Sequence, residues 1–279
     1  MIQRVRREHP GERSEIGLQR LSREHEGGYV SENRSRLAVV TGASSGIGAA
    51  TARALAGAGF EVALGARRVD RIEKLAAEIG GQAKFLDVTG SGSVEEFASW
   101  TESLGGASVL VNNAGGAKGL EPVAEMVEEN WRWMFDTNVL SIGLMTRALL
   151  PQIRRSGDGH VVIIGSAAGV EAYPGGSGYN AAKFAAHAIK ENLRLELLGE
   201  DVRVTEILPG AVETEFGLVR FGGDEERAEA PYKGITPLTA DDVAECVRWA
   251  VTLPSHVNVD RIDVKPVRQA GVATFVRDA

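Results

Sequence analysis

Short hydrophobic runs alternate along this chain with longer segments in which hydrophobic residues recur every three or four positions. The short runs are apolar throughout, which is typical of strands buried on both faces of a parallel sheet. The strands are expected at 36–42, 61–67, 83–88, 108–115, 160–166, 202–210 and 259–267. The helices are expected at 46–59, 71–80, 93–105, 130–155, 179–198 and 239–253. Strand–helix repetition with short connections predicts an α/β fold, a doubly wound parallel sheet of about seven strands with helices on both faces.

The domain organisation follows from where this pattern begins. Residues 1–36 contain eight Arg and six Glu with only isolated apolar positions, so we expect a flexible N-terminal extension. A small interaction segment is the alternative; a secretory signal is excluded because no apolar core is present. Residues 37–279 contain no linker or repeat and are expected to form a single catalytic domain. Its one long irregular stretch, about 210–237, is expected to be a substrate lid.

Composition narrows the class of partner. The chain carries 31 basic and 38 acidic residues, a net charge of −7, which argues against nucleic-acid or anionic-membrane binding. No apolar run approaches the roughly 20 residues that cross a bilayer. The single cysteine, Cys246, excludes an internal disulfide and a cysteine-based metal site, and the five histidines lie far apart. We therefore expect a soluble cytoplasmic protein whose chemistry needs no metal.

A glycine-rich sequence, Thr-Gly-Ala-Ser-Ser-Gly-Ile-Gly at 41–48, joins the first expected strand to the first helix. Gly42 allows the tight turn that leaves the strand, Gly46 lets the backbone approach a pyrophosphate, and Gly48 lets the helix pack on the sheet. The free N–H groups and partial positive charge of the helix N-terminus favour the anion. This strand–loop–helix context predicts a dinucleotide-binding site.

The glycine spacing G-x-x-x-G-x-G and several later motifs together resemble the short-chain dehydrogenase/reductase family. These motifs fall in order from about residue 37 to the chain end: Asn112-Asn113-Ala114-Gly115, Asn138, Ser166, Tyr179-Asn180-Ala181-Ala182-Lys183, Pro209-Gly210 and Thr214. The resemblance implies a Rossmann fold and hydride transfer between a nicotinamide cofactor and an alcohol or carbonyl compound. It also implies a set of cofactor contacts: Ser44, Ser45, Ile47, Asp87, Val88, Asn113, Ala114, Gly115, Tyr179, Lys183, Pro209, Gly210, Val212 and Thr214. Asp87 is expected near the adenine amine, although a turn or helix-capping role is the alternative.

The end of the second expected strand selects the form of the cofactor. A site for NAD needs a carboxylate there to bind the ribose 2′-hydroxyl, whereas this chain has Arg67 and Arg68. Guanidinium groups bind a 2′-phosphate through charge-assisted hydrogen bonds. The sequence therefore predicts NADP as cofactor; the alternative is that both arginines are solvated loop charges.

The reaction centre is expected where Tyr179 and Lys183, four residues apart, share one face of a helix. A phenol of ordinary pKa, about 10, is a poor base, but a nearby ammonium and the positive charge of oxidised nicotinamide favour the phenolate. Tyr179 is therefore expected to exchange the substrate proton, and Ser166 to donate to the substrate oxygen. The family resemblance implies that Lys183 also holds the ribose hydroxyls. It further implies that Asn138 positions a water that relays protons.

The substrate is indicated by the segments 112–123, 209–245 and 259–270, which resemble the 3-hydroxy acid dehydrogenase subgroup. That resemblance implies substrates such as L-serine, L-allo-threonine, 3-hydroxyisobutyrate, 3-hydroxypropionate and malonic semialdehyde. A small acid needs a cation, and Lys118 and Arg220 are the candidates, unless they are solvated surface charges. Phe216, Val219 and Phe221 are expected to close over the substrate or merely to pack.

Two other functions stay open at this point. One is a different carbonyl reductase of the same family, acting on 3-oxoacyl thioesters, aldehydes or ketones. The other is a non-catalytic NADP-binding regulator, against which the complete set of Ser166, Tyr179 and Lys183 argues. The resemblance also implies a homo-oligomer, with a tetramer favoured. Small residues at 181, 182, 185 and 186 permit close helix approach, between subunits or within one chain.

Overall fold

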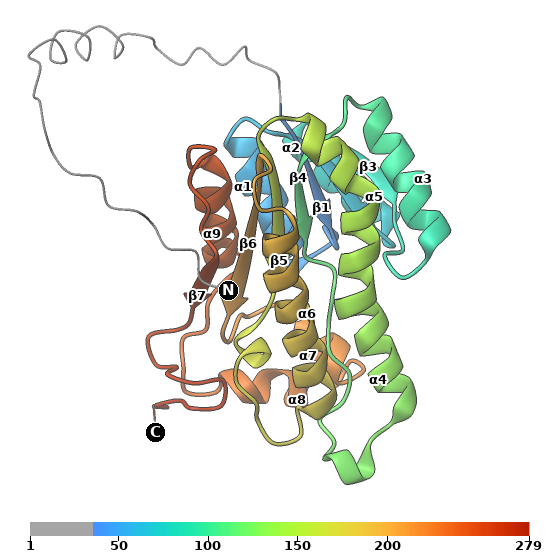
Figure 1. The fold of residues 1–279 in the computed structure, drawn as a ribbon. Coiled ribbons are helices and arrows are strands. Elements are labelled where there is room, and N and C mark those ends of the chain that lie inside the picture. Colours follow the sequence, from blue (N-terminus) through green and yellow to red (C-terminus); the bar gives the residue numbers. More distant parts are fainter. Residues whose placement is uncertain (1–35, 279) are drawn as a thin grey trace, which may run out of the picture. The chain divides into compact units, whose positions relative to one another are not determined.

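The computed structural model describes residues 36–278, so the extension expected at 1–36 lies outside the described residues except for Arg36. One seven-stranded parallel sheet, ordered β3-β2-β1-β4-β5-β6-β7, forms the centre of these residues (Figure 1). All of the expected strands are present, and the predicted fold class is confirmed. The strands are β1 (Leu37–Thr41), β2 (Glu61–Ala66), β3 (Gln82–Phe85), β4 (Ala107–Asn112), β5 (Gly159–Ile164), β6 (Val202–Pro209) and β7 (Arg261–Val264).

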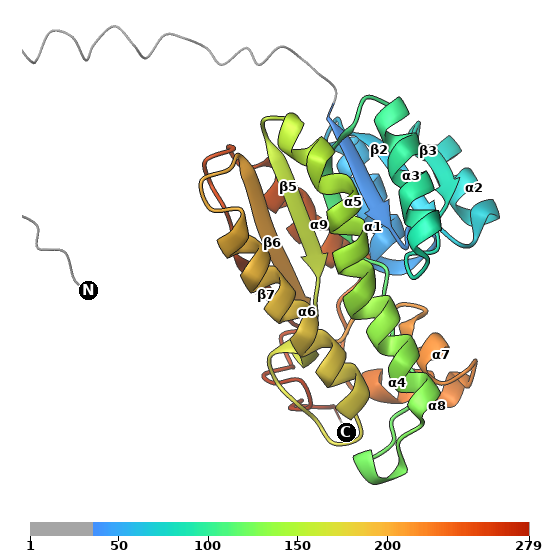
Figure 2. The same ribbon diagram turned by 45° about the vertical axis from the view of Figure 1, so that its right-hand side comes forward.

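Helices cover both faces of the sheet, as Figure 2 shows from a second side. On one face lie α1 (Gly46–Gly57), α2 (Val69–Ile79) and α9 (Ala240–Thr252). On the other lie α3 (Ser91–Ser103), α5 (Ser141–Arg155) and α6 (Ser177–Glu196). This arrangement explains why the strands β1, β4 and β5 are buried at every position.

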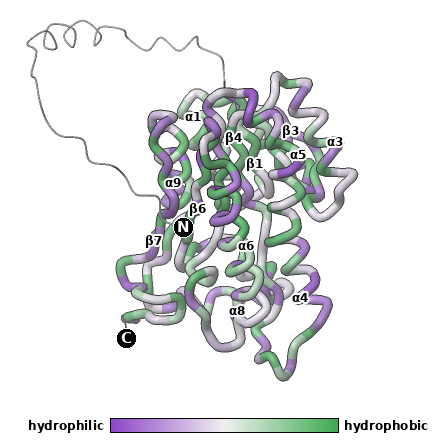
Figure 3. The backbone as a smooth tube through the Cα atoms, viewed as in Figure 1, coloured by the Kyte–Doolittle hydropathy of each residue, from purple (hydrophilic) through white to green (hydrophobic). Residues whose placement is uncertain are grey.

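Two hydrophobic clusters separate these helices from the sheet. Leu55, Ile72 and Val247 are fully buried against the first face, and Phe97 and Leu149 against the second. Hydrophobic segments accordingly follow the central strands in Figure 3. Burial of a large apolar side chain contributes about 1.5–3 kcal/mol to the free energy of folding. These clusters therefore hold the strands, and the site residues at their ends, in place.

The chain reverses direction across the sheet between β1 and β4. From β3 at one edge it crosses through α3 to β4, which lies beside β1 and begins the second half. Ligands of open α/β sheets bind outside the carboxyl ends of the strands at such a point.

The helix expected over 130–155 is longer and less regular than its pattern predicts. It begins as α4 (Glu128–Phe135), passes through one π-helical turn, η2 (Asp136–Leu140), and continues as α5. A π turn inserts an extra residue into the helical register and is frequent at functional sites. Asn138, one of the expected site residues, lies within it.

The segment expected to be irregular, 210–237, contains three short helices. They are α7 (Phe216–Arg220), α8 (Glu225–Glu229) and the 3₁₀ turn η4 (Ala230–Tyr232). Two more 3₁₀ turns, η1 (Val123–Glu125) and η3 (Ala167–Gly169), follow β4 and β5. Among the described helices, none is both long and apolar enough to cross a membrane.

Candidate active site

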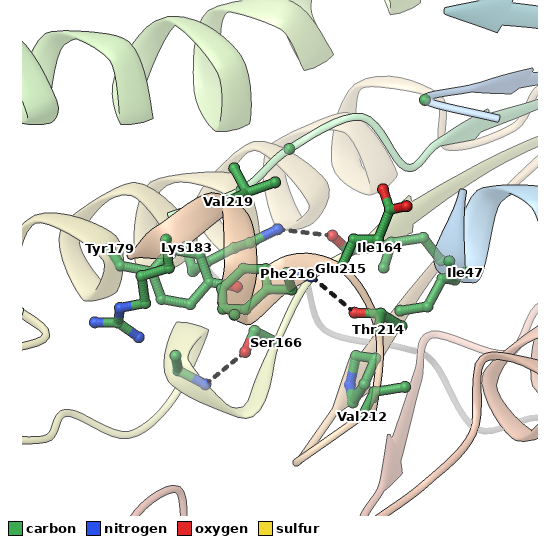
Figure 4. A pocket seen from close by; sticks show the side chains of 18 of the residues that line it. Ile47, Ile164, Ser166, Tyr179, Lys183, Val212, Thr214, Glu215, Phe216 and Val219 are labelled. Atoms are coloured by element: carbon green, nitrogen blue, oxygen red, sulfur yellow. Dashed lines mark hydrogen bonds between the residues drawn. The ribbon is translucent and has the colours of Figure 1, made fainter. Parts of the chain in front are cut away.

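A cavity of about 730 Å³ opens at the carboxyl ends of the strands (Figure 4). The structure brings nearly all of the expected site residues together around it. The expected residues that line it are Gly42, Ser44, Ser45, Gly46, Ile47, Arg67, Arg68, Asp87, Val88, Asn113, Ala114, Gly115, Ser166, Tyr179, Lys183, Pro209, Gly210, Val212 and Thr214. Gly48 and Asn138 do not line the cavity but support residues that do.

The glycine-rich loop is packed against the loop that follows β4. Gly42 has a φ of +65°, and a Cβ there would lie 2.9 Å from Ala114 Cα. A Cβ at Gly48 would lie 2.4 Å from Asn113 Nδ2, which donates to the carbonyl of Thr41 at 2.8 Å. Gly48 therefore allows the glycine-rich loop to contact the loop after β4. The sequence motif predicts instead that this glycine lets the helix pack on the sheet.

A cluster of charge lies at the outer end of the cavity, where the 2′-phosphate site is expected. Arg68 donates to the hydroxyls of Ser44 at 3.0 Å and Ser45 at 2.7 Å. It also forms an ion pair with Glu215 at 2.8 Å, and Arg71 binds the other oxygen of the same carboxylate at 2.8 Å. These two arginines lower the pKa of Glu215 to about 2. Glu215 thus ties the segment after β6 to the glycine-rich loop.

Asp87 both lines the cavity and closes a turn. Its Oδ1 accepts from the backbone N–H and the hydroxyl of Thr89, at 3.0 and 2.8 Å. The turn role and the expected place at the cavity are therefore compatible. Val88 beside it is buried and contributes apolar lining.

Tyr179, Lys183 and Ser166 meet at the inner end of the cavity (Figure 4). Lys183 Nζ donates to the carbonyl of Ile164 at 2.9 Å and lies 5.9 Å from the centre of the Tyr179 ring. Ser166 Oγ accepts from the N–H of Ala168 at 3.1 Å, and its hydroxyl interacts with the phenol of Tyr179. Phe216 packs on Tyr179 with ring centres 5.5 Å apart.

The sequence predicts that Lys183 and oxidised nicotinamide together make Tyr179 acidic, and the structure describes this group without the nicotinamide charge. Burial raises the pKa of Tyr179, which is 8% exposed, and Tyr173 acts in the same direction. The Ser166 hydroxyl and the guanidinium of Arg220 oppose that rise. Burial also lowers the pKa of Lys183 to about 8. In the protein without ligand, desolvation therefore outweighs the nearby positive charge.

Asn138 is fully engaged with main-chain groups. Its amide nitrogen donates to the carbonyls of Gly116 at 2.9 Å and Met134 at 2.7 Å, and its amide oxygen accepts from Gly116 N–H at 3.1 Å. A Cβ at Gly115 would lie 2.6 Å from this oxygen. The side chain thus anchors the loop after β4 to the π turn.

The two candidate cations for an acidic substrate lie in different places. Arg220 lines the cavity, donates from Nε to the carbonyl of Gly119 at 2.7 Å and from Nη1 to the hydroxyl of Tyr173 at 2.9 Å. Its guanidinium carbon lies 5.9 Å from the centre of the Tyr179 ring. Lys118 does not line the cavity and instead lies over the Trp133 ring at 5.0 Å. The structure therefore favours Arg220.

Sequence reasoning missed several residues of the cavity wall. Some lie near the lid or before α6, and others in the chain's last residues: Trp133, Tyr173, Tyr232, Gln269, Val272, Phe275 and Arg277. Gln269 is 6% exposed and accepts from Ala211 N–H at 2.8 Å, which ties the tail to the segment after β6. Trp133 lies on α4, where its spacing does not distinguish a cavity residue from a packing residue. The others lie outside the long helices and carry no periodic signal, so only Tyr173, just before α6, could have been suspected.

The chain is similar to known proteins over most of its length. Residues 36–220 match the family model described as short chain dehydrogenase. An uncharacterized oxidoreductase of Mycobacterium tuberculosis is 58% identical over 240 residues, which cover 86% of this chain and 94% of the relative. The NADP-dependent 3-hydroxy acid dehydrogenase of Salmonella typhi is 42% identical and covers 84% and 96%. Sulfoacetaldehyde reductase 2 of Chromohalobacter salexigens is 41% identical and covers 87% and 98%.

A solved structure of similar fold has a bound cofactor. The closed form of a serine dehydrogenase complexed with NADP⁺ superposes with a TM-score of 0.82. It is 39% identical, and the match covers 87% of this chain and 100% of the other.

Proposed function

Because this chain belongs to the short-chain dehydrogenase family, we propose that it transfers a hydride between NADP and a small hydroxy acid or its oxo counterpart. The observation that supports an acidic substrate is the position of Arg220, a cation in the cavity wall beside Tyr179. Relatives named 3-hydroxy acid dehydrogenase and sulfoacetaldehyde reductase act on small molecules of this kind, with a carboxylate or a sulfonate near the reacting carbon.

The cavity fits a phosphorylated dinucleotide. At Gly46 a Cβ would lie 3.3 Å from Thr214, so a side chain there would crowd the cleft between the glycine-rich loop and the segment after β6. Arg67 and Arg68 line the outer end of the cavity, as a 2′-phosphate requires. The relative from Salmonella typhi is named as NADP-dependent and the serine dehydrogenase was solved with NADP⁺. NADP is accordingly the cofactor that we assign.

The chemistry that the nicotinamide supplies when bound is hydride exchange and, in its oxidised form, a positive charge. Tyr179 takes the proton of the substrate hydroxyl in oxidation and returns it to the carbonyl oxygen in reduction. Lys183 is mostly protonated at neutral pH and adds a second positive charge near the phenol. Ser166, which lines the same cavity, turns its hydroxyl to donate to the substrate oxygen and so stabilises charge that develops there.

Arg220 is built to receive an oxyanion. Its Nε and Nη1 are each held by one acceptor, whereas Nη2 has no acceptor within residues 36–278. Tyr173 and Gly119 fix the plane of the guanidinium, so its unused donors are oriented in advance. Carboxylates and sulfonates both accept hydrogen bonds from such a group. We therefore assign Arg220 as the residue that selects an acidic substrate.

A substrate screen tests the proposed function against its alternatives. Purified protein with NADP⁺ is offered L-serine, 3-hydroxypropionate, isethionate and 2-butanol, and formation of reduced cofactor is followed by absorbance. We expect one or more acids to give kcat/KM well above that of the neutral alcohol. The reverse order would indicate another carbonyl reductase, and no turnover with bound cofactor would indicate a regulator.

Replacing Arg220 with methionine is expected to raise KM for the acid by about 30- to 100-fold, because a charge-assisted contact is worth about 2–3 kcal/mol. The change in kcat/KM for 2-butanol should stay within about threefold, which separates lost recognition from lost folding. Lys118→Met, outside the cavity wall, is the matched control and should leave both values unchanged. Equal losses for acid and neutral alcohol would refute this role of Arg220.

The segment 210–237 is proposed as a lid over the cavity. It holds Arg220 and Phe216 against the substrate end, and Glu215 ties it to Arg68 and Arg71. These ion pairs are partly exposed, so their strength is modest, about 1 kcal/mol or less.

Glu215→Ala is therefore expected to speed limited proteolysis within 210–237 by a few fold, with protection restored by NADP⁺. The matched control is Glu78→Ala, which removes an ion pair of similar exposure between Glu78 on α2 and Arg53 on α1. A cleavage rate equal to that of the control would contradict the proposal that Glu215 holds the lid in place.

A homo-oligomer, most simply a tetramer, is part of the proposal. Leu140 and Phe184 expose 51% and 43% of their surface at the helices η2 and α6, which the family resemblance places at a subunit interface. Light scattering of the purified protein gives the assembled mass, and a monomeric mass would contradict this part.

A further inference from the structure

A carboxylate is buried beneath the helix that carries Tyr179 and Lys183. Glu206, in the middle of β6, is 0% exposed. One of its oxygens lies 2.6 Å from His187 Nδ1, a distance at which the ring N–H donates to the carboxylate. His187 belongs to α6 and follows Lys183 by four residues, so Tyr179, Lys183 and His187 lie along one stripe of the helix.

The second oxygen of Glu206 has no hydrogen-bond partner in the described part of the chain. It lies against Gly165, where a Cβ would come within 2.6 Å of it. Gly165 directly follows Ile164, whose carbonyl accepts from Lys183 Nζ at 2.9 Å. The glycine therefore lets a buried carboxylate approach the stretch of β5 that holds the ammonium.

Three positively chargeable side chains lie close enough to Glu206 to interact with its carboxylate. Lys183, His187 and Lys190, all on α6, are the cations that face Glu206. Lys190 is itself paired with Glu191 at 3.0 Å and lies 4.0 Å from Asp260. Burial lowers the pKa of Lys183 to about 8, and Glu206 is the charge that opposes this fall. An uncompensated buried carboxylate would be costly, so the cations and Glu206 support one another.

We propose that Glu206, held in place by His187, is a positioning residue that keeps Lys183 protonated during turnover. The proposal rests on the proposed role of Lys183 in the reaction. Glu206 lies behind the cavity wall and is not among the residues that line it, so it acts only through Lys183.

The direct test is a titration of Lys183 in the protein without cofactor. The chain has only seven lysines, so the ¹³Cε signal of Lys183 in labelled protein is identified by its loss in Lys183→Arg. In Glu206→Gln, which keeps the shape and an acceptor for His187, the midpoint of Lys183 should fall by about one pH unit. An unchanged midpoint in a folded variant would overturn the proposal.

Variants of His187 supply an independent arm that leaves Glu206 intact. His187→Gln, whose amide N–H can still donate to Glu206, should keep the wild-type midpoint, whereas His187→Leu removes the donor that holds Glu206 and should lower it. Glu191→Gln is the matched control, because Glu191 is 54% exposed and lies 4.0 Å from the far nitrogen of His187. If Glu206→Gln does not fold, equal midpoints in His187→Gln and His187→Leu would still refute the proposal.

The kinetic counterpart is a pH profile. With its midpoint lowered by about one unit, Glu206→Gln should lose about fivefold in kcat/KM at pH 8 and less than about twofold at pH 6.5, since only protonated Lys183 is active. A uniform loss at every pH would indicate a purely structural role. Should no hydroxy acid be turned over at all, the proposed function fails while the titration still tests Glu206.

Discussion

Replacing Tyr179 with phenylalanine is expected to reduce kcat by about 10³-fold in both directions of the reaction. The phenol is the only proton-transferring group that we place at the reacting oxygen, and a positioned acid or base contributes about 10²- to 10⁴-fold. The ring itself remains, with its contacts to Phe216 and the cavity wall, so NADPH should bind as before. Steady-state rates together with fluorescence titration of NADPH separate the two effects.

Tyr173→Phe is the matched control for this loss. Tyr173 is a second phenol in the same cavity wall, and its hydroxyl accepts from Arg220. Its removal should raise KM for an acid severalfold and leave kcat nearly unchanged. Near-normal kcat in Tyr179→Phe, or equal losses in both variants, would exclude Tyr179 as the proton carrier.

The cofactor preference should reverse when the charges at the end of β2 are exchanged. Arg67→Asp combined with Arg68→Ala is expected to lower the ratio of kcat/KM for NADP⁺ to that for NAD⁺ by about 10²-fold or more. Each charge-assisted contact to the 2′-phosphate is worth about 1.5–3 kcal/mol, and the new carboxylate repels that group. Rates measured with both cofactors at fixed substrate give the ratio.

Arg71→Ala serves as the control in that experiment. Arg71 carries the same charge and binds the same Glu215 carboxylate as Arg68, yet it does not line the cavity. It should leave the cofactor ratio within about threefold of wild type. A ratio that stays constant in the double variant would show that Arg67 and Arg68 are only surface charges.

The strands and the dinucleotide loop could be predicted because their signals are local. Continuous burial demands apolar runs such as 37–41 and 107–112, and a loop in which Gly42 has positive φ demands glycine. The order of the motifs then placed Ser166, Tyr179 and Lys183 at one end of the sheet, where the structure brings them together.

Other features depend on contacts between distant segments and leave no such signal. The sequence pattern around Asn138 does not distinguish the π turn from ordinary α-helix. The last residues of the chain, which bring Gln269 and Phe275 to the cavity, show no hydrophobic periodicity. The direction in which the pKa of Tyr179 shifts depends on how deeply the phenol is buried. The spacing between Tyr179 and Lys183 in the sequence does not reveal that burial. Likewise only the fold shows that Arg220 rather than Lys118 faces the substrate end.

The tail has a practical consequence for handling the protein. Asp278 N–H donates to the carbonyl of Gly234 at 2.9 Å, and Arg277 donates to the carbonyls of Pro231 and Lys233. Phe275 and Arg277 also line the cavity, so a group attached beside Asp278 would lie next to the wall of the proposed active site. Kinetic constants measured with such a group attached would report its effect on the cavity wall as well as the enzyme.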